Sequence, residues 1–123
     1  MIYLLRKSDT GSFQELAHAS DVEFGQLSLL TVAPKCTRGG HYHTHKKEWF
    51  CCIHGRCYIS TTDVRTNDLR TIELNDDSKE FAIVKPYESH VVLNYSDLEC
   101  ELLVVSSEEY DPDNTDTITY NGE

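Results

Sequence analysis

The chain has 123 residues and a formal net charge of −10 at neutral pH. This length suffices for one domain, residues 1–123, with a single hydrophobic core and is too short for two. Nine of the acidic residues lie in 97–123, where lysine and arginine are absent, so the chain lacks the basic face of a nucleic-acid-binding protein. No apolar run reaches membrane-spanning length, and Arg6 and Lys7 interrupt the first one. We expect a cytoplasmic protein with no nucleic-acid or membrane partner.

Short runs rich in valine, isoleucine, leucine, tyrosine and phenylalanine alternate with glycine, proline, asparagine and aspartate along the chain. In chain order they predict strands near residues 2–6, 12–18, 25–32, 38–44, 47–53, 56–62, 69–74, 80–85, 89–94 and 100–106. Residues 108–123 are acidic and contain Pro112, which predicts an extended surface segment and not a central strand. This many short strands predict an all-β fold, either a sandwich or a closed barrel.

The cysteines are odd in number and form no Cys-x-x-Cys pair. This spacing fits neither a disulfide framework nor a zinc ribbon, so we expect reduced and mostly buried thiols. The five are Cys36, Cys51, Cys52, Cys57 and Cys100.

Histidines concentrate at one point of the pattern. His41 and His43 are two residues apart on a predicted strand and therefore project from the same face. Glu48 follows after a turn, and a second turn signal at residues 85–89 leads into His90. Three imidazoles and one carboxylate that converge in a small barrel suit a divalent metal ion, or proton transfer without a metal.

These residues also carry a resemblance. The spacing His41-x-His43-x4-Glu48-x6-Gly55 resembles the first cupin motif, although Lys35 stands where that motif usually has glycine. A reduced form of the second motif follows as Pro86-x3-His90-x3-Asn94. The resemblance implies a small, jelly-roll-like cupin β-barrel.

Further segments narrow the resemblance to the cupins of nucleotide-sugar biosynthesis. They are residues 11–16, 25–28, 36–43 and 48–50, and residues 108–117 are similar to the end of the C-terminal cupin domain of capsular-polysaccharide reductases. In that family the cupin domain epimerises a UDP-linked 4-keto-6-deoxy-hexosamine. The dTDP-sugar 3,4-ketoisomerases share the Arg-Gly-x-His-x-His core, which here is Arg38 to His43.

The resemblance implies a metal site of His41, His43, Glu48 and His90, with zinc as the default ion. The ketoisomerases often lack the glutamate and work without metal, whereas the capsular epimerase domains have both. A metal-free pocket in which the histidines hydrogen-bond to one another remains the alternative. Because the reductase domain has no counterpart in this sequence, we expect no nicotinamide cofactor.

For catalysis we expect His41 or His43 as the base. If a metal occupies those imidazoles, Tyr42, His45 or a metal-bound water would supply the proton. For substrate binding we expect Arg38, with His45 and Lys46 beside it. Each has an ordinary structural alternative, a salt bridge for Arg38 and exposed turn positions for His45 and Lys46.

The sequence therefore predicts an isomerase or epimerase that abstracts a proton beside the ketone of a UDP- or dTDP-linked 4-keto-6-deoxy sugar, in surface-polysaccharide biosynthesis. Two other classes remain open: a metal-dependent cupin dioxygenase or other oxidoreductase, and a non-catalytic sugar-binding cupin. Because small barrels of this kind often pair edge strands or sheet faces, we expect a homodimer.

Overall fold

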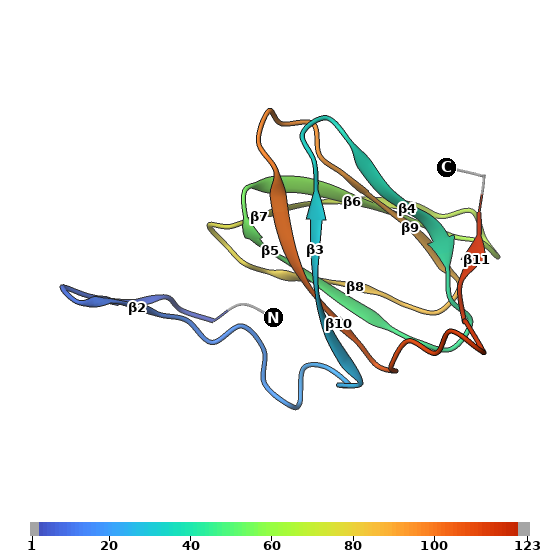
Figure 1. The fold of residues 1–123 in the computed structure, drawn as a ribbon, viewed down its shortest axis with the longest axis horizontal. Coiled ribbons are helices and arrows are strands. Elements are labelled where there is room, and N and C mark those ends of the chain that lie inside the picture. The colour runs from blue at the N-terminus through green and yellow to red at the C-terminus, as the bar shows by residue number, and fades with distance from the viewer. Residues whose placement is uncertain (1–2, 121–123) are drawn as a thin grey trace.

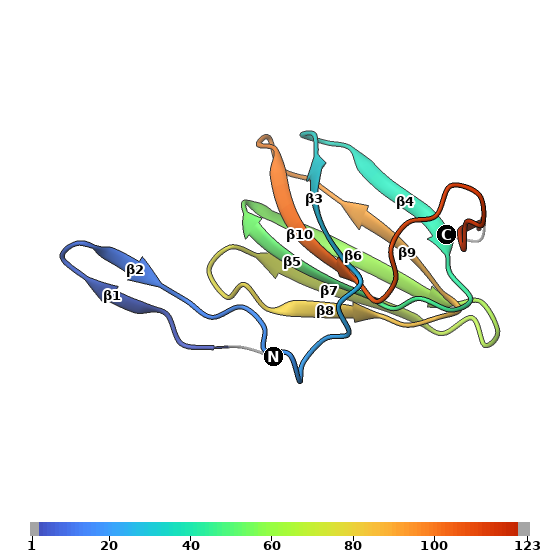
Figure 2. The same cartoon turned by 60° about the horizontal axis from the view of Figure 1, so that its bottom comes forward.

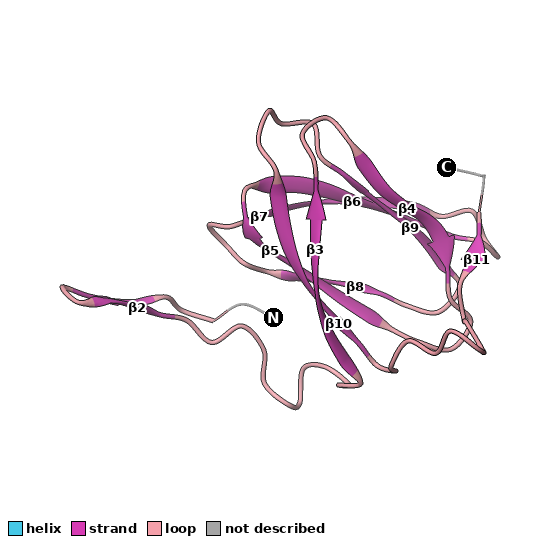
Figure 3. Ribbon diagram, in the orientation of Figure 1, coloured by secondary structure: helices cyan, strands magenta, loops and turns pink. Residues whose placement is uncertain are grey.

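Two antiparallel sheets face each other and enclose the core of the protein (Figure 1). The computed structural model describes residues 3–120. One sheet has the order β3-β10-β5-β8 and the other the order β11-β4-β9-β6-β7. Their bounds are β3 Gln26–Val32, β10 Cys100–Ser106, β5 Glu48–His54, β8 Phe81–Val84, β11 Ile118–Thr119, β4 Thr37–Tyr42, β9 Glu88–Leu93, β6 Arg56–Asp63 and β7 Leu69–Asn75. The prediction of an all-β barrel is confirmed, and Figure 3 shows only strands and loops in the described residues.

The core lies between the sheets because the apolar residues of each strand alternate. In β6, Cys57, Ile59 and Thr61 are buried, whereas Tyr58 and Ser60 on the other face are partly exposed. The buried apolar side chains of both sheets meet in one cluster, which includes Val32, Phe50, Cys52, Cys57, Ile59, Leu74, Val84, Val92, Cys100, Leu102 and Val104. The single core is what a half-buried strand pattern predicts.

Strand β5 is buried on both faces. Its outward side chains Trp49 and Cys51 pack with Phe81 and Val105 in a second cluster, which the segment around Leu16 covers. The chain before β3 therefore covers part of the outer face of the four-stranded sheet before it enters the barrel. Within residues 3–120 there is no helix that is long and apolar enough to span a bilayer.

The N-terminal hairpin is separate from both sheets. Its strands β1 (Arg6–Ser8) and β2 (Gly11–Phe13) pair only with each other among the described strands, and every residue in them is exposed. Figure 2 shows this arm projecting away from the barrel.

The strands predicted from residue 25 to residue 106 are confirmed, whereas the first two predictions are misplaced. The first hairpin strand lies at Arg6–Ser8 and not at 2–6, of which residues 1–2 lie outside the described part. The second ends at Phe13, because the following residues Leu16 and Ala17 pack on the barrel surface instead of pairing. High strand propensity located the apolar runs but not the turn at residues 9–10 that fixes the hairpin.

The acidic C-terminal segment is mostly exposed, and it returns to the barrel. Residues 107–117 lead from β10 to β11, the short strand that pairs with β4. We call residues 107–117 the strap. Residues 121–123 of the predicted segment lie outside the described residues. The predicted cysteine state agrees with the structure, in which all five cysteines are free and four are buried.

Candidate active site

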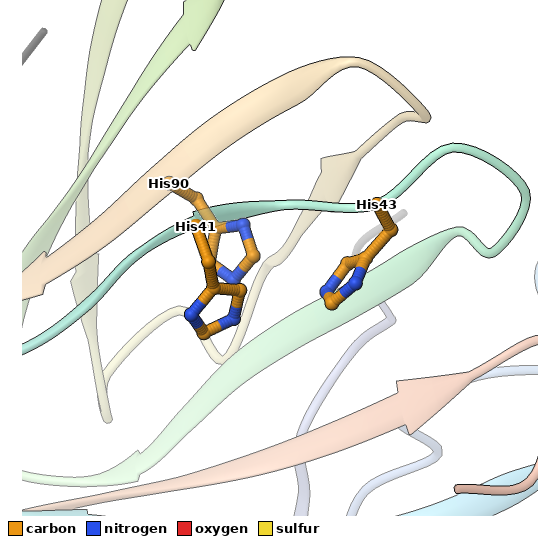
Figure 4. Close-up of side chains that lie close together, drawn as sticks. All are labelled: His41, His43 and His90. Atoms are coloured by element: carbon orange, nitrogen blue, oxygen red, sulfur yellow. The ribbon is translucent and has the colours of Figure 1, made fainter. Parts of the chain in front are cut away.

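Three histidines meet at one end of the barrel. His41 of β4 lies opposite His90 of β9, and His43 follows β4 directly. One ring nitrogen from each of the three lies within 4.8 Å of the others. In Figure 4 the three imidazoles project from the same side of the two paired strands.

A bulge in β4 makes this alignment possible. The register between β4 and β9 shifts between Gly39 and His41. Gly39 has a φ of 122°, and a Cβ atom there would lie 2.4 Å from the carbonyl oxygen of His90. Because only glycine permits this close approach and this conformation, Gly39 allows His41 to face His90.

Glu48 brings a carboxylate from the other sheet. It is the first residue of β5 and is almost fully buried. Its Oε1 lies 2.7 Å from His43 Nε2 and 3.6 Å from His90 Nε2. Glu48 therefore lies beside His43 and His90, whereas the ring nitrogens that all lie within 4.8 Å of one another belong to the three histidines alone.

The proton positions at this site leave buried atoms without partners. His43 Nδ1 contacts the main-chain carbonyl oxygen of Asp116, and because a carbonyl only accepts, Nδ1 carries the proton. In the neutral ring, Nε2 then presents a lone pair toward Glu48. Within the described part of the chain, neither His43 Nε2, Glu48 Oε1 nor His90 Nδ1 makes a hydrogen bond of acceptable geometry.

A divalent cation fits this donor set. Two electron-rich atoms 2.7 Å apart repel each other unless a proton or a cation lies between them. Three imidazoles and one carboxylate are ligands of zinc and of several other first-row metals. The residues that would hold the ion are His43, Glu48, His90 and His41.

Burial sets the protonation states. It lowers the pKa of His90 to about 4 and is the main cause of the lowered pKa of His41. Burial alone would raise the pKa of Glu48, but a proton on His43 Nε2 and positive charge on the neighbouring imidazoles outweigh it, and the pKa of Glu48 then lies below its usual value. At neutral pH, His41 and His90 are therefore neutral and Glu48 is ionised, as ligation or base catalysis requires.

A cavity of about 320 Å³ opens beside the histidines. Its polar and charged lining comes from Arg38, His41, Lys46, Glu48, His90 and Tyr110, and its apolar walls include Phe50, Val92 and Val104. This volume is within the range of small-molecule sites. Two cationic side chains, neutral imidazoles and one carboxylate thus line one open cavity.

Comparison with known proteins identifies the family. Residues 6–118 match the model of the polysaccharide biosynthesis C-terminal domain. The chain belongs to this family. The predicted kinship with cupins of nucleotide-sugar biosynthesis is confirmed.

Among curated proteins, the domain is 31% identical over 107 residues to a UDP-2-acetamido-2,6-beta-L-arabino-hexul-4-ose reductase of Pseudomonas aeruginosa, covering 87% of this chain and 28% of that protein. The capsular polysaccharide assembling protein CapF of Staphylococcus aureus is 25% identical, with a TM-score of 0.77 over 97% of this chain and 34% of CapF. This chain therefore spans about a third or less of both relatives.

The fold is also shared with NovW, a 4-keto-6-deoxy sugar epimerase of Streptomyces spheroides. That likeness has 20% identity and a TM-score of 0.79, over 91% of this chain and 64% of NovW.

Not every residue that the sequence predicted for the site of this polysaccharide biosynthesis domain lies in the cavity. Arg38 and Lys46 line it, as does His41, whereas His43 is buried behind it. Tyr42 projects from the opposite face of β4, where its ring lies 6.2 Å from that of Tyr87. His45 lies in the turn after β4 with its side chain 75% exposed.

Tyr42 and His45 lie outside the cavity for two different reasons, the alternation of side chains along β4 and the turn that follows it. Side chains alternate, so Tyr42 between His41 and His43 must point away from both. The chain turns before His45, and its Nδ1 lies 2.7 Å from the hydroxyl oxygen of Thr44. We leave both residues out of the proposed catalytic and binding set.

Sequence reasoning missed two residues of the strap. Tyr110 lines the cavity, and its main-chain N–H donates to Oε1 of Gln26 over 2.9 Å. Asp116 contacts His43, 73 residues away in the chain. The segment carries two local signals, its acidic composition and its resemblance to the end of the capsular-reductase cupin domain, and neither reveals that it returns to the histidines.

Proposed function

We propose that this domain isomerises or epimerises a nucleotide-linked 4-keto-6-deoxy sugar during surface-polysaccharide synthesis. The observation that supports it most is the neutral imidazole of His41, which lines a cavity beside an ionised carboxylate and a candidate cation site. Family membership and the 4-keto-6-deoxy sugar named for NovW agree with this substrate class.

The chemistry begins with the ketone at C4, which acidifies the proton on C3 or C5. Neutral His41 removes that proton and leaves an enolate. Return of a proton to the opposite face of the same carbon inverts it. When the proton is taken from C3, the C3 hydroxyl can pass its own proton to the enolate oxygen, and protonation of C4 then moves the ketone to C3. A base with a pKa below neutral pH is ready to accept a proton at neutral pH.

The two histidines proposed as the base, His41 and His43, differ in whether a ring nitrogen is available to the substrate. His43 donates through Nδ1 to Asp116 and faces Glu48 through Nε2, so neither nitrogen is available to substrate. His43, Glu48 and His90 would hold the ion, and His41 would remain as the base or as a fourth ligand. When bound, a divalent ion stabilises negative charge on an oxygen such as that of the enolate.

Inversion requires a second proton carrier. Tyr110 comes from the strap, a different wall of the cavity from β4, and carries an exchangeable phenolic proton. We assign the return of the proton to Tyr110. Arg38 and Lys46 line the same cavity, and we assign the substrate diphosphate to these two cations.

Deuterium exchange tests the proposal. The protein is incubated in D2O with a 4-keto-6-deoxy sugar linked to UDP or to dTDP, and the ring protons are followed by NMR. Loss of the C3 or C5 signal is expected, with a His41→Ala/His43→Ala variant inactive and the matched Tyr42→Phe variant active. Absence of exchange with both nucleotides would contradict the proposal.

The same three-histidine, one-glutamate set can hold a redox metal, which keeps a cupin oxygenase as the second candidate. Iron in the purified protein, together with oxygen consumption, would favour it. Ligand binding without turnover, unchanged in the double variant, would instead indicate a sugar-binding domain.

We also propose that two copies pair through the N-terminal arm. The arm exposes Phe13, and edge strand β3 exposes Leu27. Strand β3 has only β10 as a neighbour among the described strands, so its other edge can accept a strand from a second copy. A dimer in sedimentation that Leu27→Asp converts to monomer is expected; a wild-type monomer would contradict the pairing.

We also propose a cytoplasmic location, which the free thiols at all five cysteine positions fit.

A further inference from the structure

One residue of the strap contacts the whole loop that joins the histidines to Glu48. The Oδ1 atom of Asp116 accepts hydrogen bonds from the main-chain N–H of Thr44 over 2.8 Å and from its hydroxyl over 2.6 Å. The Oδ2 atom accepts from the N–H groups of His45 and Lys46 over 2.7 and 3.2 Å. All four hydrogen bonds of the carboxylate therefore go to residues 44–46, between His43 and Glu48.

The main chain of the same residue contacts the ring of His43. Its carbonyl oxygen accepts the Nδ1 proton, which leaves the lone pair on Nε2. That lone pair faces Glu48. Asp116 thus holds the loop through its side chain and selects the tautomer of His43 through its main chain.

The strap has a second attachment that does not depend on this carboxylate. Ile118 and Thr119 pair with β4, and the N–H of Tyr120 donates to the carbonyl of Gly40 over 2.9 Å. Removing the charge of Asp116 should therefore leave the strap and the main-chain carbonyl of Asp116 in place. The ring of His43 should move away from that carbonyl only because residues 44–46, which follow it directly in the chain, lose their hydrogen bonds.

We propose that Asp116 is a positioning residue that fixes His43 in the Nδ1–H tautomer and directs its Nε2 toward the cation site. The hydrogen bond from the non-ligating nitrogen of a histidine orients the ring and determines which nitrogen can bind metal. The proposal rests on the cation site of the proposed function, but its test separates the two.

The test variant is Asp116→Asn, with Asp113→Asn as the matched control on the same strap. In either orientation of the new amide, its NH2 group faces two of the four donors in residues 44–46. Because an NH2 group donates and does not accept, those two hydrogen bonds to the loop are lost. Asp113 accepts no hydrogen bond from residues 44–46 in the described structure.

Two readouts are used on the full chain. Long-range nitrogen–proton NMR on metal-free protein reports the tautomer of His43, and titration with Co2+ alone reports affinity. We expect the Nδ1–H tautomer in the wild type and Asp113→Asn, mixed tautomers in Asp116→Asn, and an affinity for Co2+ weaker by roughly 10- to 100-fold in that variant. Thermal unfolding confirms that each variant is folded.

An unchanged tautomer and an unchanged Co2+ affinity in folded Asp116→Asn would overturn the proposal. If that variant does not fold, Thr44→Val removes one of the four donors, and a smaller shift of both readouts is expected; no shift would again overturn it. A wild type that binds no Co2+ would refute the cation site. In that case the tautomer of His43, compared between the wild type and Asp116→Asn, would by itself decide whether Asp116 positions the ring.

Discussion

The two ends of strand β9 differ in whether their buried polar side chains have hydrogen-bond partners. After its last residue, the side chain of Asn94 donates to the carbonyls of Val32, Ala33 and Leu98, and its Oδ1 accepts from Ser96. Near its first residue, His90 Nδ1 and the facing atoms of Glu48 and His43 lack hydrogen-bond partners within residues 3–120.

This difference separates a residue that builds the barrel from residues that are available to a ligand. An unsatisfied buried polar group costs about 1 to 3 kcal/mol, so three of them clustered at one end oppose folding. The Asn94 end connects loops by satisfied hydrogen bonds. At the histidine end the polar atoms stay unsatisfied, and binding of a cation or a substrate there can offset the free-energy cost of burying them.

The largest effect should come from His43→Ala. Because it removes one donor of the unpartnered cluster, turnover should fall by roughly 100-fold or more, whereas the fold should persist since His43 adds little apolar area to the core. Exchange kinetics and circular dichroism check the two halves. Unfolding of this variant would place His43 with Asn94 among the structural residues.

The converse change is Asn94→Ala. It removes the side-chain donor to the carbonyls of Val32, Ala33 and Leu98, of which the last two keep a second donor in the N–H of Cys36 and the hydroxyl of Ser96. The free energy of unfolding should therefore fall by about 1 to 3 kcal/mol, while turnover per folded molecule stays near the wild-type value. Urea unfolding and active-site titration measure both. A loss of turnover larger than the loss of folded protein would contradict a purely structural Asn94.

The pH dependence of stability sharpens the comparison. Burial lowers the pKa of His90 from 6.5 to about 4, so between these values the unfolded chain binds more protons. The free energy of unfolding of chelator-treated protein should therefore decrease as the pH falls from 6.5 to 4, by roughly 1 to 3 kcal/mol. The lowered pKa of Glu48 acts with the same sign at the acidic end.

Urea denaturation at pH 7 and pH 5 measures this slope. In His90→Gln the slope should be shallower, because the titrating group is gone. An equal slope in both proteins would show that His90 is not the buried neutral group that the structure indicates.

The smallest effect should come from Tyr42→Phe. Its ring lies against Tyr87 and Tyr120 on the outer face of β4, away from the cavity. Deuterium exchange should stay within about twofold of the wild-type rate, since no proton transfer reaches that face. A large loss would restore Tyr42 as a proton donor.

Local spacing was sufficient for the parts of the site that depend on alternation. His41 and His43 share a face because they are two residues apart, and Glu48 and His90 follow turn signals that the residues themselves carry. The same alternation, applied to Tyr42, would have excluded it from the cavity.

The parts that sequence reasoning missed depend on long-range return of the chain. Asp116 reaches His43 because β11 pairs with β4, and that short edge strand has too few residues to show a period. The displaced first strands have a similar cause, since Leu16 and Ala17 are held by packing on the barrel and not by pairing.

The origin of the four candidate ligands has a mechanical consequence. His41 and His90 belong to the five-stranded sheet, whereas Glu48 starts β5 of the four-stranded sheet. An ion held by all of them would bridge the two halves of the barrel like a cross-link, and it would resist their separation. Assembly of the site and closure of the barrel are then the same event, so the spacing between the sheets sets the coordination distances.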